Sequence, residues 1–426
     1  MKKYMYILLM AVVCMGILGG CGSEKTASPE AAAKNADAFP VGAIYPLSGS
    51  NALQGNECLT ACELAVQYVN EDGGVLGRPV ELTKADAPDP ATATTEASRL
   101  VDQTGVKVIF GSLSSGNALA IAGVTDKAGV CLVESGGIVD SLTDQGYQYV
   151  YRILDKGGMR GAAGVQYIAD VLAGKIGKPA ADLKVAILHE ESSYGTCVAD
   201  GAEERCNELG LEVVYRDSYA TTLTDMSALV LKIREAQPDV LLTVCYVNDA
   251  ILLVDTLDQL QAMPKIFMGC GAGTTDPNFA MTIGDERADG MFCTDMPTNL
   301  PLDIFEPSGL KPVVEKFRAD WLAQYPDMAN VPIAAEAAFA GAYTFLKEVL
   351  PNCSDLDDPQ AIREAALSTK LDMTALGFGW DLGEDGQNQA AAANINQWQG
   401  GEVVTIAPEL MQTGEAINVP LPGADY

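Results

Sequence analysis

Short apolar runs alternate with amphipathic segments along most of the chain from residue 39 onward. The run "VKVIF" (residues 106–110) is rich in β-branched residues and is typical of a buried strand, and the segment after it has the apolar spacing of a helix. Strands separated by helices of ten or more residues predict parallel βαβ units in a doubly wound α/β sheet.

The alternation restarts after Arg152, so a second α/β unit of similar size is predicted. The chain has 426 residues, which is too many for one hydrophobic core. Two long helices are expected at Leu310–Gln324 and Pro332–Val349, and short strands with Gly-rich turns are expected at the C-terminal end. We therefore expect two lobes.

The first twenty residues have the pattern of a secretory signal peptide. Lys2 and Lys3 precede an apolar run to Leu18, which is short for a membrane span. The following "LGGC" resembles a bacterial lipobox, which implies that Cys21 becomes a lipid-modified N-terminus. The alternative is an ordinary signal followed by an unrelated cysteine. Residues 21–38 have the composition of a flexible tether.

Charge and composition narrow the function classes. The formal net charge is −30, and it becomes −32 without residues 1–20 because Lys2 and Lys3 are the charged residues there. Such acidity argues against nucleic acid or an anionic membrane surface as a partner. The chain has one histidine and no paired C-x-x-C spacing, so no metal site and no cofactor is expected.

Nine cysteines remain after Cys14 and Cys21 are set aside, and several lie in strand-like runs. Free buried thiols are expected, with one or two disulfides as the alternative. No nucleophile–base set is recognisable, and His189 at a strand end is expected to be structural or to support the cleft indirectly. The carboxylate-rich Asp381–Gly386 is expected to form a turn rather than a calcium loop.

A Gly/Ser loop follows the strand at residues 106–110, in "FGSLSSGNALA". Small residues let a ligand approach the backbone, and the free N–H groups at a helix start favour an anion or a carbonyl oxygen. The alternative is a plain connection with a serine N-cap. In open α/β sheets, ligands bind beyond the carboxyl ends of the strands, where this loop lies.

The ordered segments "AIYPLSGSNALQG", "YVNEDGGVLGRPVEL", "VIFGSLSSGNALA", "VAILHEESSYGT", "FMGCGAG" and "DLGEDG…INQWQGGEVV" resemble the branched-chain amino-acid-binding family of periplasmic solute-binding proteins. These are the type I receptors of ABC importers. The resemblance implies two lobes joined by three crossovers, near 151–153, 292–294 and 375–378, with a ligand trapped as the lobes close. Residues 39–151 and 294–375 would form one lobe, and residues 152–293 and 376–426 the other.

The resemblance also implies where a ligand binds. Ser114 and Ser115 would hold a carboxylate, and Tyr194 and Tyr246 would face them across the cleft or serve only in packing. The full set of expected ligand contacts is Gln54, Ser114, Ser115, Ser135, Gly136, Gly137, Ile138, Tyr194, Tyr246 and Gly271.

Two positions depart from the family's pattern for amino acids. Ile138 stands where relatives usually carry Ser or Thr, and Gly271 stands where an acidic residue usually pairs the ligand amine. Glu134 or Asp249 could supply the missing charge, or both are solvated loop acids. These departures put a standard α-amino acid in doubt.

The expected function is that of a monomeric, extracytoplasmic, lipid-anchored solute-binding protein. It would bind a small molecule and deliver it to ABC permease and ATPase subunits. A ligand-sensing module with the same fold is the first alternative, and an α/β enzyme is the second.

Overall fold

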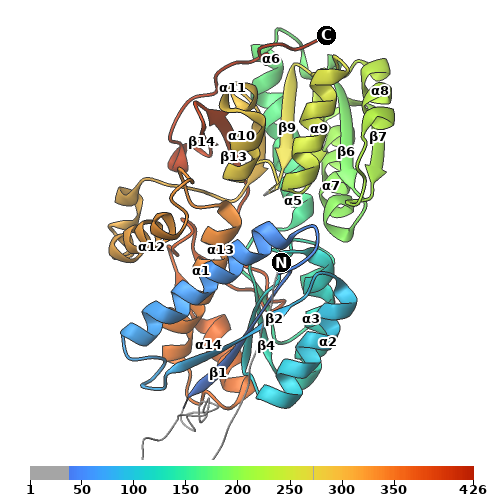
Figure 1. Ribbon diagram of the computed structural model, residues 1–426. Coiled ribbons are helices and arrows are strands. Elements are labelled where there is room, and N and C mark those ends of the chain that lie inside the picture. The colour runs from blue at the N-terminus through green and yellow to red at the C-terminus, as the bar shows by residue number, and fades with distance from the viewer. Residues whose placement is uncertain (1–37, 272) are drawn as a thin grey trace, which may run out of the picture. The chain divides into compact units, whose positions relative to one another are not determined.

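The computed structural model describes residues 38–271 and 273–426. The expected signal peptide, Cys21 and the tether up to residue 37 lie outside the described residues. The unit Asp37–Tyr426 consists of two α/β halves, each built on its own sheet (Figure 1). We call them lobe 1 and lobe 2. No helix in the described part of the chain has both the length and the apolar character of a membrane span.

Lobe 1 contains a parallel sheet of five strands in the order β2-β1-β3-β4-β5. The strands are β1 (Phe39–Tyr45), β2 (Val80–Asp86), β3 (Val108–Gly111), β4 (Cys131–Glu134) and β5 (Val150–Arg152). Helices cover both faces: α1 (Ala52–Glu71), α2 (Pro90–Arg99), α3 (Ser115–Ala128), α4 (Ser141–Asp144), α12 (Lys311–Gln324), α13 (Ile333–Thr344) and α14 (Pro359–Ser368).

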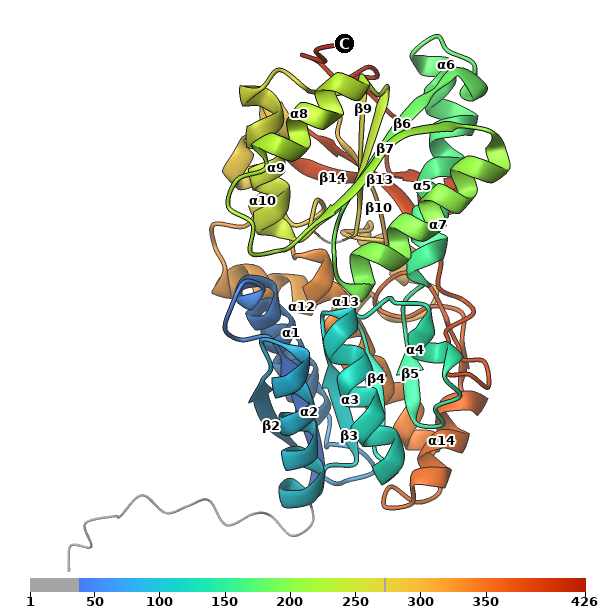
Figure 2. The ribbon, with the colours of Figure 1, turned by 90° about the vertical axis from the view of Figure 1, so that its right-hand side faces the viewer.

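Alternate residues of the lobe 1 strands face opposite layers of helices, as the two-residue period of a strand requires. Val108 and Phe110 belong to the core shared with α1 and α13, whereas Ile109 belongs to the core shared with α2 and α3. Figure 2 shows α2 and α3 together on the near side of this sheet. Both faces are buried, which explains why the strands appear in the sequence as continuous apolar runs.

Lobe 2 contains seven strands in the order β14-β13-β10-β9-β8-β6-β7. They are β6 (Lys184–Glu190), β7 (Glu212–Tyr219), β8 (Val240–Val244), β9 (Ile266–Cys270), β10 (Phe292–Asp295), β13 (Asn394–Gln399) and β14 (Glu402–Ala407). The five from β6 to β10 are parallel, while β13 is antiparallel to β10 and β14 is antiparallel to β13. The expected α/β pattern of both lobes is therefore present, with an antiparallel C-terminal edge.

The helices of lobe 2 also form two layers. They are α5 (Gly157–Tyr167), α6 (Ala173–Lys175), α7 (Ser193–Leu209), α8 (Ser227–Ala236), α9 (Val247–Gln259), α10 (Pro277–Ile283) and α11 (Asp285–Ala288). Val185 and Ile187 of β6 pack with α5 and α7, whereas Ala186 and Leu188 pack with α8, α9 and α10. Short π-helical turns extend α2, α5 and α13, at Leu100–Thr104, Ile168–Leu172 and Phe345–Val349.

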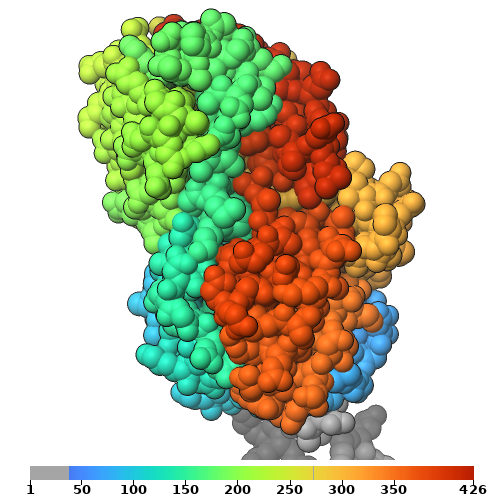
Figure 3. Space-filling view, turned by 180° about the vertical axis from the view of Figure 1, so that it is seen from behind, coloured from blue at the N-terminus to red at the C-terminus, as the bar shows by residue number. Residues whose placement is uncertain are grey.

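The chain passes between the lobes three times: from β5 to α5, from β10 toward α12, and from the small β11 (Lys370–Leu371)–β12 (Trp380–Asp381) pair to β13. The first and third passages are joined by hydrogen bonds. Arg152 Nε donates to Gln387 Oε1 at 2.7 Å, and Asn388 Nδ2 donates to the Ile153 carbonyl at 2.9 Å. Seen from behind, green and orange-to-red segments run side by side from one lobe to the other (Figure 3).

Candidate ligand-binding site

A pocket lies between the lobes at the carboxyl ends of their parallel strands. The space between its lining atoms measures about 440 Å³ when the part open to solvent is included, but the centre of a water-sized molecule has only about 30 Å³ available. That is room for one or two waters. The described conformation is therefore a closed one, with side chains from both lobes in contact across the cleft.

The pocket contains six of the ten residues expected from the sequence. These are Gln54, Ser135, Gly136, Ile138, Tyr194 and Tyr246. Ser114, Ser115, Gly137 and Gly271 lie outside its lining. Six lining residues were not anticipated: Leu113, Leu154, Arg160, Gly273, Met296 and Ala334.

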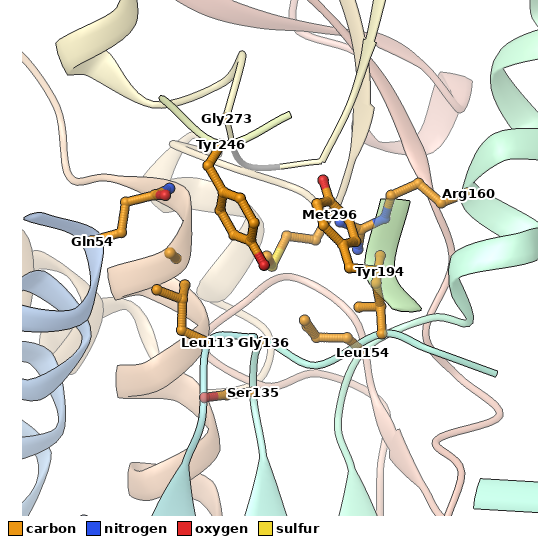
Figure 4. A pocket seen from close by; sticks show the side chains of 12 residues that line it. Gln54, Leu113, Ser135, Gly136, Leu154, Arg160, Tyr194, Tyr246, Gly273 and Met296 are labelled. Carbon is orange, nitrogen blue, oxygen red and sulfur yellow. The ribbon is translucent and has the colours of Figure 1, made fainter. Parts of the chain in front are cut away.

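Apolar and aromatic side chains form most of the wall. Tyr194 lies in the first turn of α7 and Tyr246 precedes α9, and their ring centroids are 5.4 Å apart. Burial raises the pKa of both phenols, so their hydroxyl groups stay protonated. Figure 4 shows Tyr246 extending from lobe 2 toward Leu113 and Gly136, which lie in the loops after β3 and β4 of lobe 1. Such a wall favours a ligand with an apolar or aromatic body.

Glu134 at the end of β4 holds the lobe 1 loops that face the cleft. Its Oε1 accepts hydrogen bonds from the backbone N–H groups of Ser112, Gly136 and Gly137 at 2.7, 2.8 and 2.6 Å. Burial raises the pKa of this carboxyl group, although the three donors act in the opposite direction. Glu134 is fully buried, so the interpretation of it as a solvated loop acid is wrong.

Asp249, the other candidate acid, is also buried. Its Oδ2 accepts hydrogen bonds from the Tyr246 backbone N–H at 3.2 Å and from the Tyr219 hydroxyl at 3.3 Å, so it caps the start of α9. Burial raises its pKa to about 6. The solvated interpretation is wrong here too, and neither Glu134 nor Asp249 lines the pocket.

The two serines of the "FGSLSSGNALA" loop take part in local hydrogen bonds. Ser114 Oγ accepts from the Asn117 N–H at 3.3 Å as the N-cap of α3, and Ser115 Oγ accepts from the Val139 N–H at 3.1 Å. Ser135 Oγ, which does line the pocket, donates to the Gly111 carbonyl at 3.3 Å. The N-cap alternative for this loop is present, and a ligand contact by Ser114 or Ser115 stays a prediction.

Gly271 has a steric reason to lack a side chain. Its φ is +93°, which L-residues rarely adopt, and a Cβ there would lie 2.0 Å from the Tyr194 hydroxyl oxygen. That hydroxyl donates to the Cys270 carbonyl at 2.8 Å. Tyr194 thus occupies the space that an acidic side chain at position 271 would need.

Among the described lining residues, Arg160 of α5 is the one with a charged side chain. Its Nε and Nη2 donate to Asp155 at 3.1 and 2.5 Å, and its Nη1 donates to Asp295 at 2.5 Å. All three residues are at most 2% exposed. Burial acts to lower the pKa of the guanidinium, but the two carboxylates outweigh it and raise that pKa above its usual range.

A guanidinium carries five N–H groups, and three of those on Arg160 bind the two aspartates. Among residues 38–271 and 273–426, no acceptor forms a hydrogen bond with the other two N–H groups. Arg160 can therefore offer a ligand two N–H donors from a rigidly held group. Sequence reasoning missed it because it lies within an expected helix, not in a loop after a strand.

The histidine and the cysteines considered in the sequence analysis do not line the pocket. His189 is buried, with Nδ1 2.8 Å from the Glu190 carbonyl oxygen, and is not in the pocket. The nine cysteines from Cys58 to Cys353 are free thiols, and all but Cys197 are buried. Within the described residues no cluster of His, Cys, Asp and Glu could hold a metal ion.

Two α/β lobes joined by three passages, with a pocket between their strand ends, define a two-lobed binding protein. Comparison with known proteins agrees. The family model described as "Periplasmic binding protein" matches residues 38–402. The chain is 34% identical over 370 residues to the Leu/Ile/Val-binding protein homolog 8 of Brucella abortus (strain 2308), which covers 86% of this chain and 90% of that protein.

Solved structures share the fold at lower identity. The leucine binding protein LivK of Thermotoga maritima MSB8 aligns with a TM-score of 0.74 at 21% identity, covering 87% of this chain and 98% of that one. A solute binding protein of an R. palustris ABC transporter, in complex with benzoate, aligns with a TM-score of 0.72 at 18% identity, covering 90% and 100%.

The chain therefore belongs to the periplasmic binding protein family, and the predicted resemblance to its branched-chain amino-acid-binding type I members is confirmed. Members of this family are extracytoplasmic solute-binding proteins.

The steric constraint at Gly271 can be measured against a matched glycine. Gly284 has a φ of +94° with no atom within 4 Å of its Cβ position, so Gly284→Ala carries the backbone strain alone. We expect Gly271→Ala to lower the free energy of unfolding by roughly 1–3 kcal/mol more than Gly284→Ala does. Chemical denaturation measures both.

Adding Tyr194→Phe to Gly271→Ala should recover part of that extra loss, because the hydroxyl oxygen at 2.0 Å is removed. Equal losses for the two glycine variants, or no recovery in the double variant, would contradict the assignment.

Proposed function

We propose that this chain is the solute-binding lipoprotein of an ABC importer. It captures a small amino-acid-like or carboxylate-bearing ligand in the cleft between its lobes, and its lobes close on the ligand by motion about the three passages. The observation that carries this proposal is the pocket, whose wall combines Gln54, Leu113 and Ser135 of lobe 1 with Tyr194, Tyr246 and Arg160 of lobe 2. Contacts to both lobes exist only in the closed state, so a ligand shifts the open–closed equilibrium.

The pocket wall supports an apolar or aromatic ligand that ends in a carboxylate or an amide. Arg160 offers two N–H donors to such an acceptor, and the tyrosine rings flank it. None of the described lining residues carries a carboxylate side chain, and an ammonium group buried without an acidic partner is strongly disfavoured. The relative that holds benzoate and the relatives named for leucine, isoleucine and valine support a small carboxylate-bearing ligand.

The ligand class is tested by a thermal-shift screen of leucine, isoleucine and valine against aromatic and aliphatic carboxylates and amides. A ligand at about 100 times its dissociation constant adds about 2.7 kcal/mol. With an unfolding entropy of about 2.1 cal/mol/K per residue, that is a shift on the order of 3 °C for roughly 400 residues. We expect the aromatic compounds to give the larger shifts.

A ligand found in this way should reduce the radius of gyration in solution scattering as the lobes close. Identical scattering with and without saturating ligand would refute capture by closure. Micromolar or tighter binding of leucine would overturn the ligand class and leave the transport function standing.

The role of Arg160 is tested by Arg160→Lys, which keeps the positive charge between the two aspartates but loses the planar set of donors. We expect binding of a ligand with a carboxylate or amide end to weaken at least about tenfold, which corresponds to about 1.4 kcal/mol. Isothermal titration calorimetry measures it. Arg216 pairs with Asp200 and Glu203 outside the pocket, so Arg216→Lys is the control and should bind normally.

The membrane anchor that we propose is Cys21. Cys21→Ala should release the protein from the membrane fraction or leave its signal uncleaved, because the thiol that accepts the lipid is gone. Mass spectrometry of the N-terminal peptide checks the lipid directly. A membrane-bound wild-type protein without lipid on Cys21 would rule the anchor out.

A further inference from the structure

Two carboxyl groups from opposite lobes meet beside the pocket. Glu57 lies on α1 of lobe 1, one turn after the pocket residue Gln54, and Asp276 is the N-cap of α10 in lobe 2 (Figure 1). Their residues are 1% and 0% exposed. Asn278 Nδ2 donates to Glu57 Oε1 at 3.1 Å and to Asp276 Oδ1 at 2.8 Å. One amide group therefore bridges two buried acids across the cleft.

Among the described residues the pair has no compensating cation. Within the same residues, Glu57 Oε2 and Asp276 Oδ2 are buried and make no geometric hydrogen bond, although the Gln54 side chain interacts with the Asp276 carboxyl group and acts to lower its pKa. Among the described residues, none of the interactions that shift the two carboxyl groups comes from a lysine, arginine or histidine. Burial raises the pKa of both, and the Asp276 carboxylate raises that of Glu57 further.

The surrounding elements add no positive charge either. On α1, the Cys58 thiol has a pKa raised by burial and stays neutral. On α13, which packs on α1, Glu336 Oε1 forms an ion pair with Arg318 Nη2 at 3.2 Å.

The strand-end acid Glu134 and the α9 acid Asp249 are buried carboxyl groups as well. On α11, Arg287 is engaged by Asp255 and Asp258. Two buried carboxyl groups that share one amide donor, with no cation among the described residues that shift them, are strongly disfavoured from ionising together.

We propose that Glu57 and Asp276 form a proton-binding latch: closure of the lobes takes up a proton from solvent that the two carboxyl groups share, and opening of the cleft releases it. The latch rests on the proposed closure of the lobes. It means that closure binds a proton as well as a ligand. In the closed state the bound proton forms an O–H bond on one of the two carboxyl groups.

The sign of the pH dependence follows from linkage. In an open cleft the two acids are hydrated and have pKa values of about 4, so they are ionised at neutral pH. Closure raises both pKa values. The stabilisation of the closed state by proton uptake is therefore complete below the ordinary carboxyl range and is lost as the pH rises. Because closure takes up one proton, the closed-to-open ratio falls by up to about tenfold for each unit by which the pH rises.

The experiment uses the protein without ligand, at about pH 5 and about pH 8, two points above the ordinary carboxyl range. Solution scattering measures the radius of gyration, and calorimetry measures the melting temperature. In the wild-type protein we expect a larger radius and a lower melting temperature at the higher pH. Glu57→Gln supplies a neutral group of the same shape, so both differences should shrink toward zero.

Glu63→Gln is the matched control. Glu63 lies on the same helix and pairs with Lys84 within lobe 1 at 2.6 Å, so its removal should leave the wild-type pH dependence unchanged. Asp276→Asn is the second variant, because asparagine retains N-cap ability, and it should behave like Glu57→Gln even if the latter fails to fold.

Wild-type pH dependence retained in either folded variant overturns the latch, and so does a wild-type protein whose radius and melting temperature do not change with pH. Because no ligand is present, these outcomes leave the proposed transport function untouched. Failure to find a ligand likewise leaves the latch untouched.

Discussion

The guanidinium of Arg160 is the interaction on which the geometry of the cleft depends. Its partner Asp155 lies in the first passage between the lobes, and Asp295 ends β10 where the second passage begins. Burying an ion is costly, and the cost is offset only when partners satisfy it with good geometry. Here two buried carboxylates do so, which fixes α5 against β10 at the place where the chain crosses. The two ion pairs therefore tie the first passage and the end of β10 to a residue of the pocket wall.

A second kind of interaction fixes the loops that face the cleft: hydrogen bonds from backbone N–H groups to a buried carboxylate, with no cation involved. Glu134 ends β4 and Glu190 ends β6, and each carboxylate accepts hydrogen bonds from backbone N–H groups in the residues that follow it. Glu190 Oε1 accepts from the Gly195 N–H at 2.6 Å and from Ser192 Oγ at 2.5 Å. The same solution thus occurs in both lobes. These N–H groups are therefore used by the protein itself, and the polar side chains among the described pocket residues belong to Gln54, Ser135, Arg160 and the two tyrosines.

The sequence predicted the lobes and much of the pocket, because buried parallel strands leave a clear pattern and ligand loops follow their carboxyl ends. It did not reveal Arg160 or Met296, since one lies inside a helix and the other in a passage, where no strand-to-helix junction marks the position. It also could not show that Glu134 is buried. An acid after a strand is ordinarily solvated, and the N–H donors that satisfy this one come from Ser112, twenty-two positions earlier, as well as from its own loop.

Few polar contacts hold the closed cleft together on the side away from the passages. Asn278 donates to Glu57, and Asn248 Nδ2 donates to the Ser50 carbonyl at 3.2 Å. A hydrogen bond of this kind contributes only about 1 kcal/mol net, so these contacts alone give closure little advantage over hydration of the open cleft. A ligand that buries apolar surface against Leu113 and Met296 adds a term of about 25 cal/mol per Å² that the open state lacks. Under the proposed closure mechanism, an occupant of the pocket therefore shifts the balance toward the closed form beyond what the contacts between the lobes and the Glu57–Asp276 pair provide.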